Sequence, residues 1–271
     1  MQVQDCFFGV FKEIYDSGKG NIHLIDSYAS KFAESYDVVS ISDDDEIELY
    51  IKYLSLCHGR TVLELACGSG RITIPLARKG YKVTGVDISD DMLELLKSKA
   101  GKAVRQRIQL FNDDITVLNR IQEKFNLVIL PATSIRLLDV DLKTFINHIY
   151  NYVEDGGYFI FDFRDLFETD EKIVEGKMVS QTYEKNGEFN VVFIQEQYDS
   201  IKMKSKTNFY INSMGETNEV YLGYSDLNLF KYSEVKAILK DTKFSFYEIQ
   251  KSGEYTGNIC DGNIYTCILK K

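Results

Sequence analysis

The feature that most constrains the fold is a glycine-containing turn between an apolar strand and a helix. Residues 62–66 are apolar apart from Glu64, the turn contains Gly68 and Gly70, and residues 72–78 have helical apolar spacing. Glycine adopts backbone angles that other residues avoid and lets a ligand approach the main chain, while the start of the following helix favours negative charge. The sequence therefore predicts a strand, turn and helix that bind an anion or a carboxylate.

Two details of this segment narrow the ligand. Dinucleotide-binding turns usually read G-x-G-x-x-G, but Thr73 stands where the third glycine would be, which weakens the interpretation as a nicotinamide site. The next strand, residues 82–86, ends in Asp87, seventeen positions after Gly70. An acidic residue at that place can accept hydrogen bonds from both hydroxyls of a ribose. The ligand is therefore expected to carry an unphosphorylated ribose.

Several motifs in order resemble those of class I S-adenosylmethionine (SAM)-dependent methyltransferases. They are Glu64-Leu-Ala-Cys-Gly-Ser-Gly70, Val83-Thr-Gly-Val-Asp87, Asn112-Asp-Asp-Ile115, Phe125-Asn-Leu-Val-Ile-Leu130 and Glu154-Asp-Gly-Gly-Tyr-Phe-Ile-Phe-Asp162. One departure is Ala66, which replaces the first of the family's three usual glycines. The resemblance covers roughly residues 45–165 and the C-terminal end. It implies an α/β fold with a Rossmann-like seven-stranded sheet, and an enzyme that uses SAM and releases S-adenosylhomocysteine.

The resemblance also implies roles for the motif residues. Arg71 is expected to reach the methionine carboxylate, and Met92 to pack on the adenine. Alignment on Ile115 favours Asp114 as the acceptor of the adenine amino hydrogens; Asp113 is the alternative, and one of the two acids would then cap the turn. The carbonyl of Leu130 is a candidate acceptor for the methionine ammonium. The other positions expected at the cofactor are Glu64, Ala66, Cys67, Gly68, Gly70, Asp87, Ile88 and Ile115.

The chain is predicted to have three parts. Residues 1–40 form a helical arm, which is either a lid over the cofactor or a helix packed on the core. Residues 41–165 and 229–271 form the SAM-binding domain. The segment between them, residues 166–228, alternates polar and apolar positions and has an Asn-Gly turn, the dipeptide preferred in hairpins. It is predicted to be an antiparallel β insert after the fifth strand that covers the acceptor site.

The charge and the cysteine content of the chain limit which binding partners and which cellular compartment are expected. The net charge of -9 and a pI near 5.0 argue against a protein that binds by neutralising phosphates, so nucleic acid is a poor partner, although a local basic patch remains compatible. The five cysteines include no C-x-x-C pair, which predicts reduced thiols in a cytoplasm and no metal site. No basic leader or membrane-spanning apolar run is present, so no membrane partner is expected. A homodimer is left open.

The scarcity of histidine bears on the acceptor. An alcohol or phenol acceptor usually needs a general base, most often histidine, and the chain has only His23, His58 and His148. His58 precedes the first strand and His148 lies within a helix, so only His23 is a loose candidate. An amine can lose its proton to solvent or to a carboxylate, and Asp162 at the end of the fifth strand could hold an ammonium and take that proton. N-methylation of a small molecule, an amino sugar or a peptide is therefore predicted.

Further acceptor residues and rival functions remain open. Tyr36 resembles a tyrosine that lines the active site of small-molecule methyltransferases, with ordinary packing as the alternative. Tyr183 is one of several tyrosines that alternate with polar residues in the insert, of which one or two are expected to line the acceptor pocket. Asp165 or Arg164 could bind a substrate hydroxyl or carboxylate. The alternatives are an O-methyltransferase of a small metabolite, a non-catalytic SAM-binding module and a nicotinamide oxidoreductase.

Overall fold

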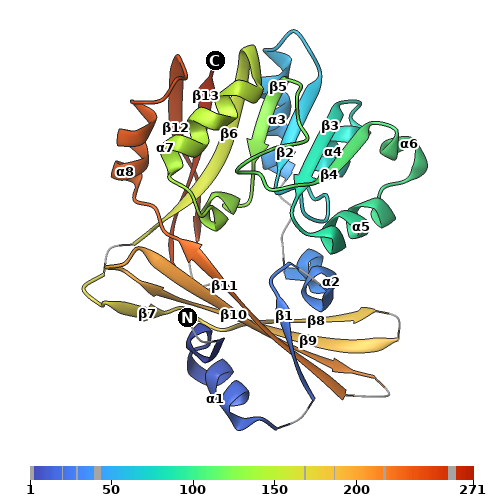
Figure 1. Ribbon diagram of the computed structural model, residues 1–271, viewed down its shortest axis with the longest axis vertical. Helices are drawn as coiled ribbons and strands as arrows, with labels where there is room; N and C mark the ends of the chain where they lie inside the picture. Colours follow the sequence, from blue (N-terminus) through green and yellow to red (C-terminus); the bar gives the residue numbers. More distant parts are fainter. Residues whose placement is uncertain are drawn as a thin grey trace. The chain divides into compact units, whose positions relative to one another are not determined.

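The computed structural model describes residues 3–19, 21–28, 30–39, 44–167, 169–185, 187–215, 218–255 and 261–271 (Figure 1). The chain divides into two units. The larger unit consists of Ser42–Asp165, Phe230–Gly253 and Ile264–Lys271, and the smaller unit of Met1–Ile41, Leu166–Leu229 and Glu254–Asn263. The N-terminal segment and the insert, which the sequence treats as separate parts, thus belong to one unit.

The larger unit is built on a seven-stranded sheet with the strand order β12-β13-β6-β5-β2-β3-β4. The pairs from β6 through β5, β2 and β3 to β4 are parallel. The predicted Rossmann-like α/β fold is therefore confirmed. The strands are β2 (Thr61–Leu65), β3 (Lys82–Asp87), β4 (Ile108–Asn112), β5 (Phe125–Leu130), β6 (Val153–Leu166), β12 (Phe246–Tyr255) and β13 (Gly262–Lys270).

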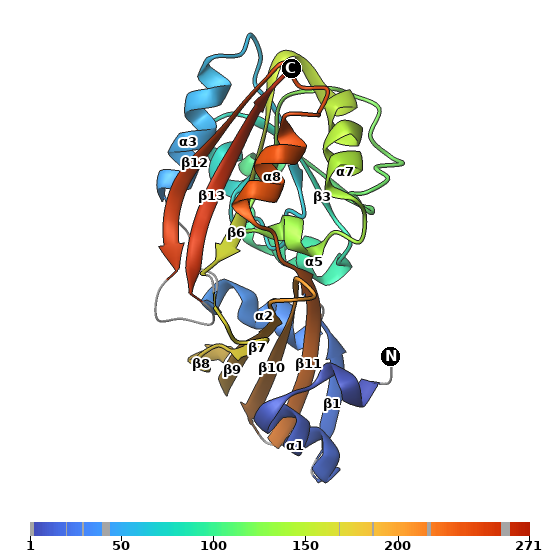
Figure 2. The ribbon, with the colours of Figure 1, turned by 90° about the vertical axis from the view of Figure 1, so that its left-hand side faces the viewer.

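Helices cover both faces of this sheet, and Figure 2 shows α3 on one side of it and α7 and α8 on the other. The helices are α3 (Asp44–Ser55), α4 (Thr73–Arg78), α5 (Asp90–Lys99), α6 (Lys102–Arg105), α7 (Leu142–Ile149) and α8 (Tyr232–Leu239). Successive residues of a strand point to opposite faces. Val62 accordingly packs with α3, and Leu63 with α7 and α8. Because both faces are buried, β2 and β5 are almost continuously apolar.

The smaller unit is built on a second sheet with the order β1-β11-β10-β9-β7, in which β8 also pairs with β9. The pairs among β8, β9, β10 and β11 are antiparallel, as the alternating pattern predicts. The strand β1 joins β11 in parallel and is absent from the sequence-based prediction. The strands are β1 (Ile22–Asp26), β7 (Ile173–Glu175), β8 (Val179–Lys185), β9 (Glu188–Asp199), β10 (Lys204–Met214) and β11 (Asn218–Asn228).

Two N-terminal helices, α1 (Gly9–Ser17) and α2 (Ser30–Val39), pack on this second sheet. Phe11 of α1 packs with Leu222, whereas Phe32 of α2 packs in the cluster that Tyr221 joins. Tyr221 and Leu222 are neighbours in β11 and point to opposite faces, so the two helices cover opposite faces of the sheet. The N-terminal arm therefore has a packed position in the smaller unit, and its action as a lid stays a prediction.

Candidate functional site

The turn after β2 requires unusual backbone angles. Gly68 and Gly70 have φ values of 52° and 87°, and Ala66 has a φ of 53°. A left-handed conformation costs a non-glycine residue about 1–2 kcal/mol, so Ala66 carries strain at the position where the motif usually has glycine. A Cβ on Gly68 would meet no atom within 4 Å, whereas one on Gly70 would lie 2.6 Å from Cγ of Leu96. Gly70 therefore allows α5 to pack closely, and Gly68 borders open space.

Asp87 ties the end of β3 to this turn. Its Oδ2 atom accepts a hydrogen bond from the Gly68 N–H at 2.7 Å, and its Oδ1 atom accepts one from the Ser89 N–H at 2.8 Å. The residue is only 8% exposed, and burial raises the pKa of its carboxyl although both hydrogen bonds oppose the rise. The Asp87 carboxylate is thus fixed against the glycine turn, at the place where the sequence predicts a ribose.

Glu64 lies in β2 directly below the turn and is buried. The hydroxyl of Thr73 donates a hydrogen bond to its carboxyl group. Burial raises the pKa of Glu64 to about 8 against the opposing effects of Thr73 and Arg71, so this carboxyl is mostly protonated at neutral pH. Thr73, which stands in place of a third glycine, therefore serves as the partner of a buried acid.

Arg71 lies directly after the turn and forms an ion pair with Glu46 of α3. Its Nη1 atom donates to Oε2 of Glu46 at 2.5 Å, and the Tyr50 hydroxyl donates to Oε1 of the same carboxylate at 2.8 Å. Arg71 has the anionic partner that its position at a helix start calls for. Glu46 is not among the residues predicted from the sequence, because residues 43–46 are a run of acids at the start of a helix, where the helix dipole favours such side chains without any further role. The spacing of Glu46 and Tyr50, four residues apart on one helix face, was the available signal.

Asp162 lies near the carboxyl end of β6, and its Oδ1 atom accepts a hydrogen bond from the Thr133 N–H at 3.0 Å. Ala132 and Thr133, in the loop after β5, both have left-handed φ values, 58° and 54°. Such strain in non-glycine residues is typical of functional loops. Burial, followed by the charge of Glu46, raises the pKa of Asp162 to about 7. Asp162 therefore changes its charge near neutral pH.

The residues predicted to contact the adenine differ in exposure and in the hydrogen bonds that they already make. Both carboxylate oxygens of Asp113 accept N–H groups, from Asp114 at 2.9 Å and from Arg120 at 3.0 Å, so Asp113 caps its loop. Asp114 is exposed, and its Oδ1 atom accepts from Thr116. Ile88 is 75% exposed and offers an apolar surface, whereas Met92 is 1% exposed and has little surface left for a ligand.

Tyr36 and Tyr183 both belong to the smaller unit, where they border one hydrophobic cluster around Phe32. The Tyr183 hydroxyl is buried and has no hydrogen-bond partner among the described residues. Its cross-strand neighbour Asn190 is fully buried, and its Oδ1 atom likewise has no partner in the described part of the chain. Two buried polar atoms on paired strands therefore lack hydrogen-bond partners among the described residues, and each costs about 1–3 kcal/mol of stability.

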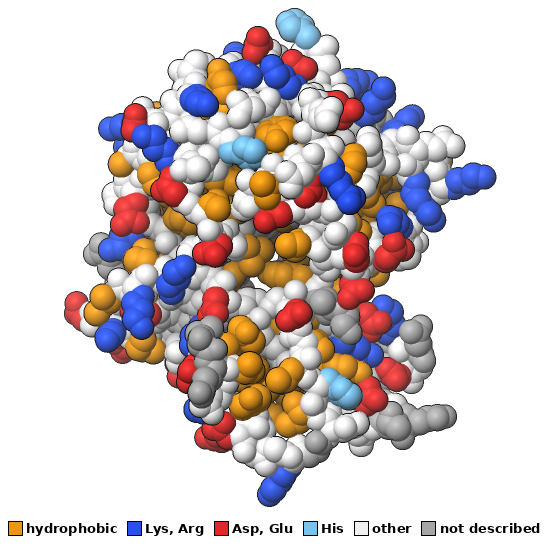
Figure 3. Space-filling view, in the orientation of Figure 1, with side chains coloured by type: hydrophobic (Ala, Val, Ile, Leu, Met, Phe, Trp, Pro, Cys, Tyr) orange, Lys and Arg blue, Asp and Glu red, His pale blue; other side chains and the backbone are white. Residues whose placement is uncertain are grey.

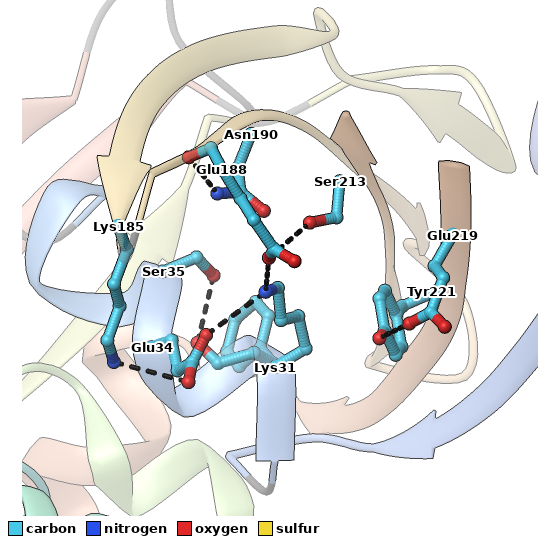
Figure 4. Close-up of polar contacts among 10 residues, drawn as sticks. Lys31, Glu34, Ser35, Lys185, Glu188, Asn190, Ser213, Glu219 and Tyr221 are labelled. Carbon is cyan, nitrogen blue, oxygen red and sulfur yellow. Dashed lines mark hydrogen bonds and ion pairs between the residues drawn. The ribbon is translucent and has the colours of Figure 1, made fainter. Parts of the chain in front are cut away.

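Charged residues gather near Asn190, and Figure 4 shows Lys31 and Glu34 of α2 beside Lys185 and Glu188 of the sheet. Nζ of Lys31 lies 3.0 Å from Glu188 and 3.4 Å from Glu34. Glu34 is also paired with Lys185 at 3.2 Å. The side chain of Lys31 is only 14% exposed, so this lysine is held between two carboxylates.

Two of the three histidines lie in regular elements. His23 lies on β1 and stacks on Tyr221 at 5.1 Å between ring centroids, and His148 lies on α7. No three His, Cys, Asp or Glu side chains of the described ranges are placed to hold a metal. Cys6, Cys57, Cys67 and Cys267 form no disulfide within the described residues, and Cys260 lies outside them. None of the helices in the described part of the chain is long and apolar enough to cross a bilayer.

The strand ends of the larger unit thus bring together a glycine turn, a carboxylate at the next strand end and an arginine, at the edge of a doubly wound α/β sheet where such sheets bind their ligands. Comparison with known proteins narrows the class. Residues 62–157 match the methyltransferase domain family. YqeM of Bacillus subtilis, provisionally named a methyltransferase, is 24% identical over 224 residues, which cover 80% of this chain and 87% of YqeM.

Solved structures share the fold over most of the chain. A SAM-dependent methyltransferase of Clostridium acetobutylicum matches with a TM-score of 0.63 and 21% identity, covering 89% of this chain and 97% of its own. The sugar N-methyltransferase KedS8 of Streptoalloteichus matches with a TM-score of 0.69 and 14% identity, covering 94% and 98%. The chain is a SAM-dependent methyltransferase with the class I fold, and SAM is its cofactor.

Curated relatives differ in the atom that their names say is methylated. The glycine/sarcosine N-methyltransferase of Aphanothece halophytica is 28% identical over 57% of this chain and 62% of its own length. A ubiquinone biosynthesis O-methyltransferase of Coxiella burnetii is 28% identical over 41% of this chain and 47% of its own length. The relatives thus include both N- and O-methyltransferases by name.

The residues at the strand ends fit the cofactor chemically. SAM carries a ribose, a cationic sulfur, an ammonium and a carboxylate. Asp87 offers a fixed carboxylate beside the open space at Gly68, and Arg71 offers a cation for the carboxylate. The exposed Ile88 offers an apolar surface for the base. The ribose, the carboxylate and the base would therefore each find a chemically complementary group in the larger unit.

The raised pKa of Glu64 predicts how stability varies with pH. The folded protein retains a proton on Glu64 up to a pH of about 8, whereas the unfolded chain loses it near the ordinary value of 4.5. Stability of the ligand-free protein should therefore fall as the pH rises through this window. Glu64→Gln keeps the shape without the titration. Thermal unfolding should show the variant gaining on the order of 1 kcal/mol or more over the wild type between pH 5 and pH 9.

Asp162 has a raised pKa as well, so part of the pH dependence should persist in Glu64→Gln. The matched control is Glu48→Gln, because Glu48 is exposed and pairs with Lys79 at the surface. An unchanged difference between Glu64→Gln and the wild type across this pH range would show that Glu64 is ionised in the fold.

Proposed function

We propose that this enzyme N-methylates an amine of a small molecule, an amino sugar or a peptide. The observation that carries the proposal is the Asp162 carboxylate, which lies near the end of β6 and has a pKa raised to about 7. A carboxylate in such a place can bind an ammonium and take its proton near neutral pH. The scarcity of histidine supports the same choice of acceptor, since an oxygen acceptor usually needs a stronger base.

Bound SAM supplies a methyl group that is activated by the positive sulfur. The acceptor nitrogen must first present a free lone pair. Asp162 accepts one proton from the acceptor ammonium, and the main-chain N–H of Thr133 holds the carboxylate in place during that transfer. The deprotonated amine would have the free lone pair that attack on the methyl carbon of SAM requires, and the electron pair of the carbon–sulfur bond would stay on sulfur. Alignment of nitrogen, carbon and sulfur is the main contribution of the protein.

The relatives support this proposal without deciding it. KedS8 is a sugar N-methyltransferase and shares the fold along nearly the whole chain. A ubiquinone O-methyltransferase is also among the relatives, so an oxygen acceptor is the second candidate. A panel of amino sugars, peptide amines and matching hydroxyl compounds, incubated with isotope-labelled SAM, tests the two. Label on nitrogen in the product, established by mass analysis, is the expected result, and label on oxygen would overturn the proposal.

The cofactor roles inferred from the motifs are carried forward as part of this proposal. Asp87 binds the ribose, Arg71 the methionine carboxylate and Leu130 the methionine ammonium. Asp114, with an exposed side chain, is favoured over Asp113 for the adenine amino group, because both oxygens of Asp113 are engaged in its own loop. The remaining proposed contacts are Glu64, Ala66, Cys67, Gly68, Gly70, Ile88, Met92 and Ile115.

The role of Asp87 predicts a loss of cofactor affinity. Asp87→Asn should weaken binding of S-adenosylhomocysteine about 10- to 100-fold, because hydrogen bonds from the ribose to a charged acceptor are lost. Calorimetric titration measures the dissociation constant. Asp90→Asn is the control, since Asp90 is exposed on the next helix and should leave binding unchanged. Equal affinities of Asp87→Asn and the wild type for S-adenosylhomocysteine would show that Asp87 does not bind the ribose.

The role of Asp162 predicts a pH dependence. For the best amine of the panel, kcat/KM of the wild type should rise with pH through about 7, as Asp162 becomes ionised. Asp162→Asn should lower kcat/KM about 100-fold and remove this rise, since the amide cannot accept the proton. Initial-rate profiles between pH 5.5 and 9 provide the measurement. Asp155→Asn on the same strand is the control, because its side chain is 92% exposed. A profile unaltered by Asp162→Asn contradicts the proposed base.

Tyr36 and Tyr183 are proposed to bind the acceptor. The hydroxyl of Tyr183 is the stronger candidate, because it is buried beside an unpaired Asn190 oxygen within the described part of the chain. A hydroxyl or amine of the acceptor would supply the hydrogen bonds that these two groups lack. Tyr36 packs edge to face on Tyr28, at 5.8 Å between ring centroids, which also fits a purely structural role.

Tyr183→Phe separates binding from folding. Removal of an unpaired buried hydroxyl should leave the unfolding temperature equal or higher, because its desolvation cost of about 1–3 kcal/mol disappears. The KM for the acceptor should rise severalfold, while the affinity for S-adenosylhomocysteine stays the same. Tyr210→Phe, on the opposite face of the same sheet, serves as the control. A destabilised variant with an unchanged KM would give Tyr183 a structural role instead.

The remaining partner predictions concern surfaces and location. Lys and Arg side chains gather over α6 at one edge of the larger unit (Figure 3). They belong to a short segment of exposed residues that contains Lys99, Lys102, Arg105 and Arg107. The net charge of the chain is nevertheless -9, and we retain a small or peptide acceptor rather than nucleic acid. A cytoplasmic location and a homodimer stay predictions.

A further inference from the structure

Two ion pairs join α3 to the segment that follows the glycine turn, and they differ in burial. Glu46 pairs with Arg71 at 2.5 Å, and their side chains are 20% and 15% exposed. Glu48 pairs with Lys79 at 3.0 Å, and their side chains are 64% and 47% exposed. The exposed pair is worth little, because solvent screens it. In the shielded pair, the cost of desolvating two charges offsets much of their attraction, so the pair is weak evidence for a role in stability. A role in positioning Arg71 is the alternative.

The Glu46 carboxylate is itself held in place. The Tyr50 hydroxyl donates to Oε1, and Arg71 donates to Oε2, so each carboxylate oxygen has one fixed donor. Tyr50 is 3% exposed and packs in the cluster of α3 with Ile72 and Leu76. A rigid ring thus orients Glu46, and Glu46 in turn orients the guanidinium of Arg71 beside the glycine turn.

We propose that Glu46 is a positioning residue that, together with Tyr50, holds Arg71 ready for the carboxylate of the amino acid part of SAM. The inference rests on the proposed role of Arg71. A guanidinium has five N–H donors in a fixed fork, so one edge can bind Glu46 while another binds a second carboxylate. An arginine that is already immobilised loses less side-chain entropy when its ligand binds, and this raises affinity.

The charges around Arg71 favour a positioning role for Glu46 over a purely electrostatic attraction of the ligand carboxylate. Glu64, Asp162 and Glu46 all interact electrostatically with Arg71 or with one another at the strand ends. Because Glu46 neutralises Arg71, the pair carries no net charge to attract a carboxylate from a distance. What remains is the direction of the guanidinium N–H groups, which Glu46 sets.

The test compares two ligands that differ in the part Arg71 contacts. S-adenosylhomocysteine has the amino acid carboxylate, and 5′-methylthioadenosine has the same nucleoside and thioether without it. Calorimetric titrations are made with the wild type, Glu46→Gln, Tyr50→Phe, Arg71→Gln and Glu48→Gln. Glu46→Gln should raise the dissociation constant of S-adenosylhomocysteine about tenfold, the equivalent of one charge-assisted hydrogen bond. The dissociation constant of 5′-methylthioadenosine should stay within about twofold of the wild-type value.

The variants should form a graded series. Tyr50→Phe should weaken S-adenosylhomocysteine less than Glu46→Gln and in the same selective way, and it keeps the test available if Glu46→Gln folds poorly. The Glu48–Lys79 pair joins the same two segments, so Glu48→Gln is the matched control and should leave the affinity for both ligands unchanged. Once Arg71 is replaced by Gln, adding Glu46→Gln should have no further effect, because the group that Glu46 positions is gone.

Each outcome is decisive. If Arg71→Gln weakens S-adenosylhomocysteine but Glu46→Gln does not, or tightens it, positioning by Glu46 is wrong and the role of Arg71 stands. If Arg71→Gln binds both ligands as the wild type does, the role of Arg71 fails and the inference fails with it. An equal loss of both ligands in Glu46→Gln would show a structural role only. No acceptor is present in these titrations, so they are independent of whether the enzyme methylates nitrogen.

Discussion

The hydrogen bond from the Gly68 N–H to Asp87 is the interaction on which the site depends. It joins the turn after β2 to the end of β3, so the main chain of one loop and the carboxylate of the next strand are fixed together. Parallel pairing of β2 with β3 brings the two ends into register. The same order of strands places the ends of β5 and β6 along the same edge, where doubly wound sheets bind their ligands. The cofactor site is thus a direct consequence of the sheet topology.

The parts of the fold that depend on local pattern could be predicted from the sequence. The helix expected over residues 72–78 and the strand expected over residues 82–86 correspond to α4 (Thr73–Arg78) and β3 (Lys82–Asp87), because apolar spacing and the glycine turn define them. The strand β1 was missed. It is short, lies largely exposed and pairs with β11, nearly two hundred residues later in the chain. Only a long-range contact makes that segment a strand, and no local pattern records such a contact.

The candidate site divides in the same way. The sequence predicts that Gly68, Gly70, Asp87 and Asp162 lie at or near strand ends, and the structure has them there: the two glycines follow β2, Asp87 ends β3 and Asp162 lies near the end of β6. Whether they bind the cofactor or the acceptor stays a prediction. Glu46 was missed, since its partner Arg71 lies 25 positions away and the acidic run around it also fits a helix cap. The unpaired hydroxyl of Tyr183 could not be foreseen either, because burial without a partner depends on packing between strands.

The energetics of the strand ends explain why the enzyme tolerates so costly an arrangement. Ala66, Ala132 and Thr133 hold left-handed angles, and Glu64 and Asp162 are acids with pKa values raised to about 8 and about 7. Each of these features opposes folding. A cationic ligand reverses the electrostatic part, because a positive charge beside a buried acid favours its ionised form. In the proposed site, the acids that destabilise the ligand-free protein would therefore strengthen the binding of a sulfonium and an ammonium. The large apolar core of the sheet supplies the stability that offsets their cost.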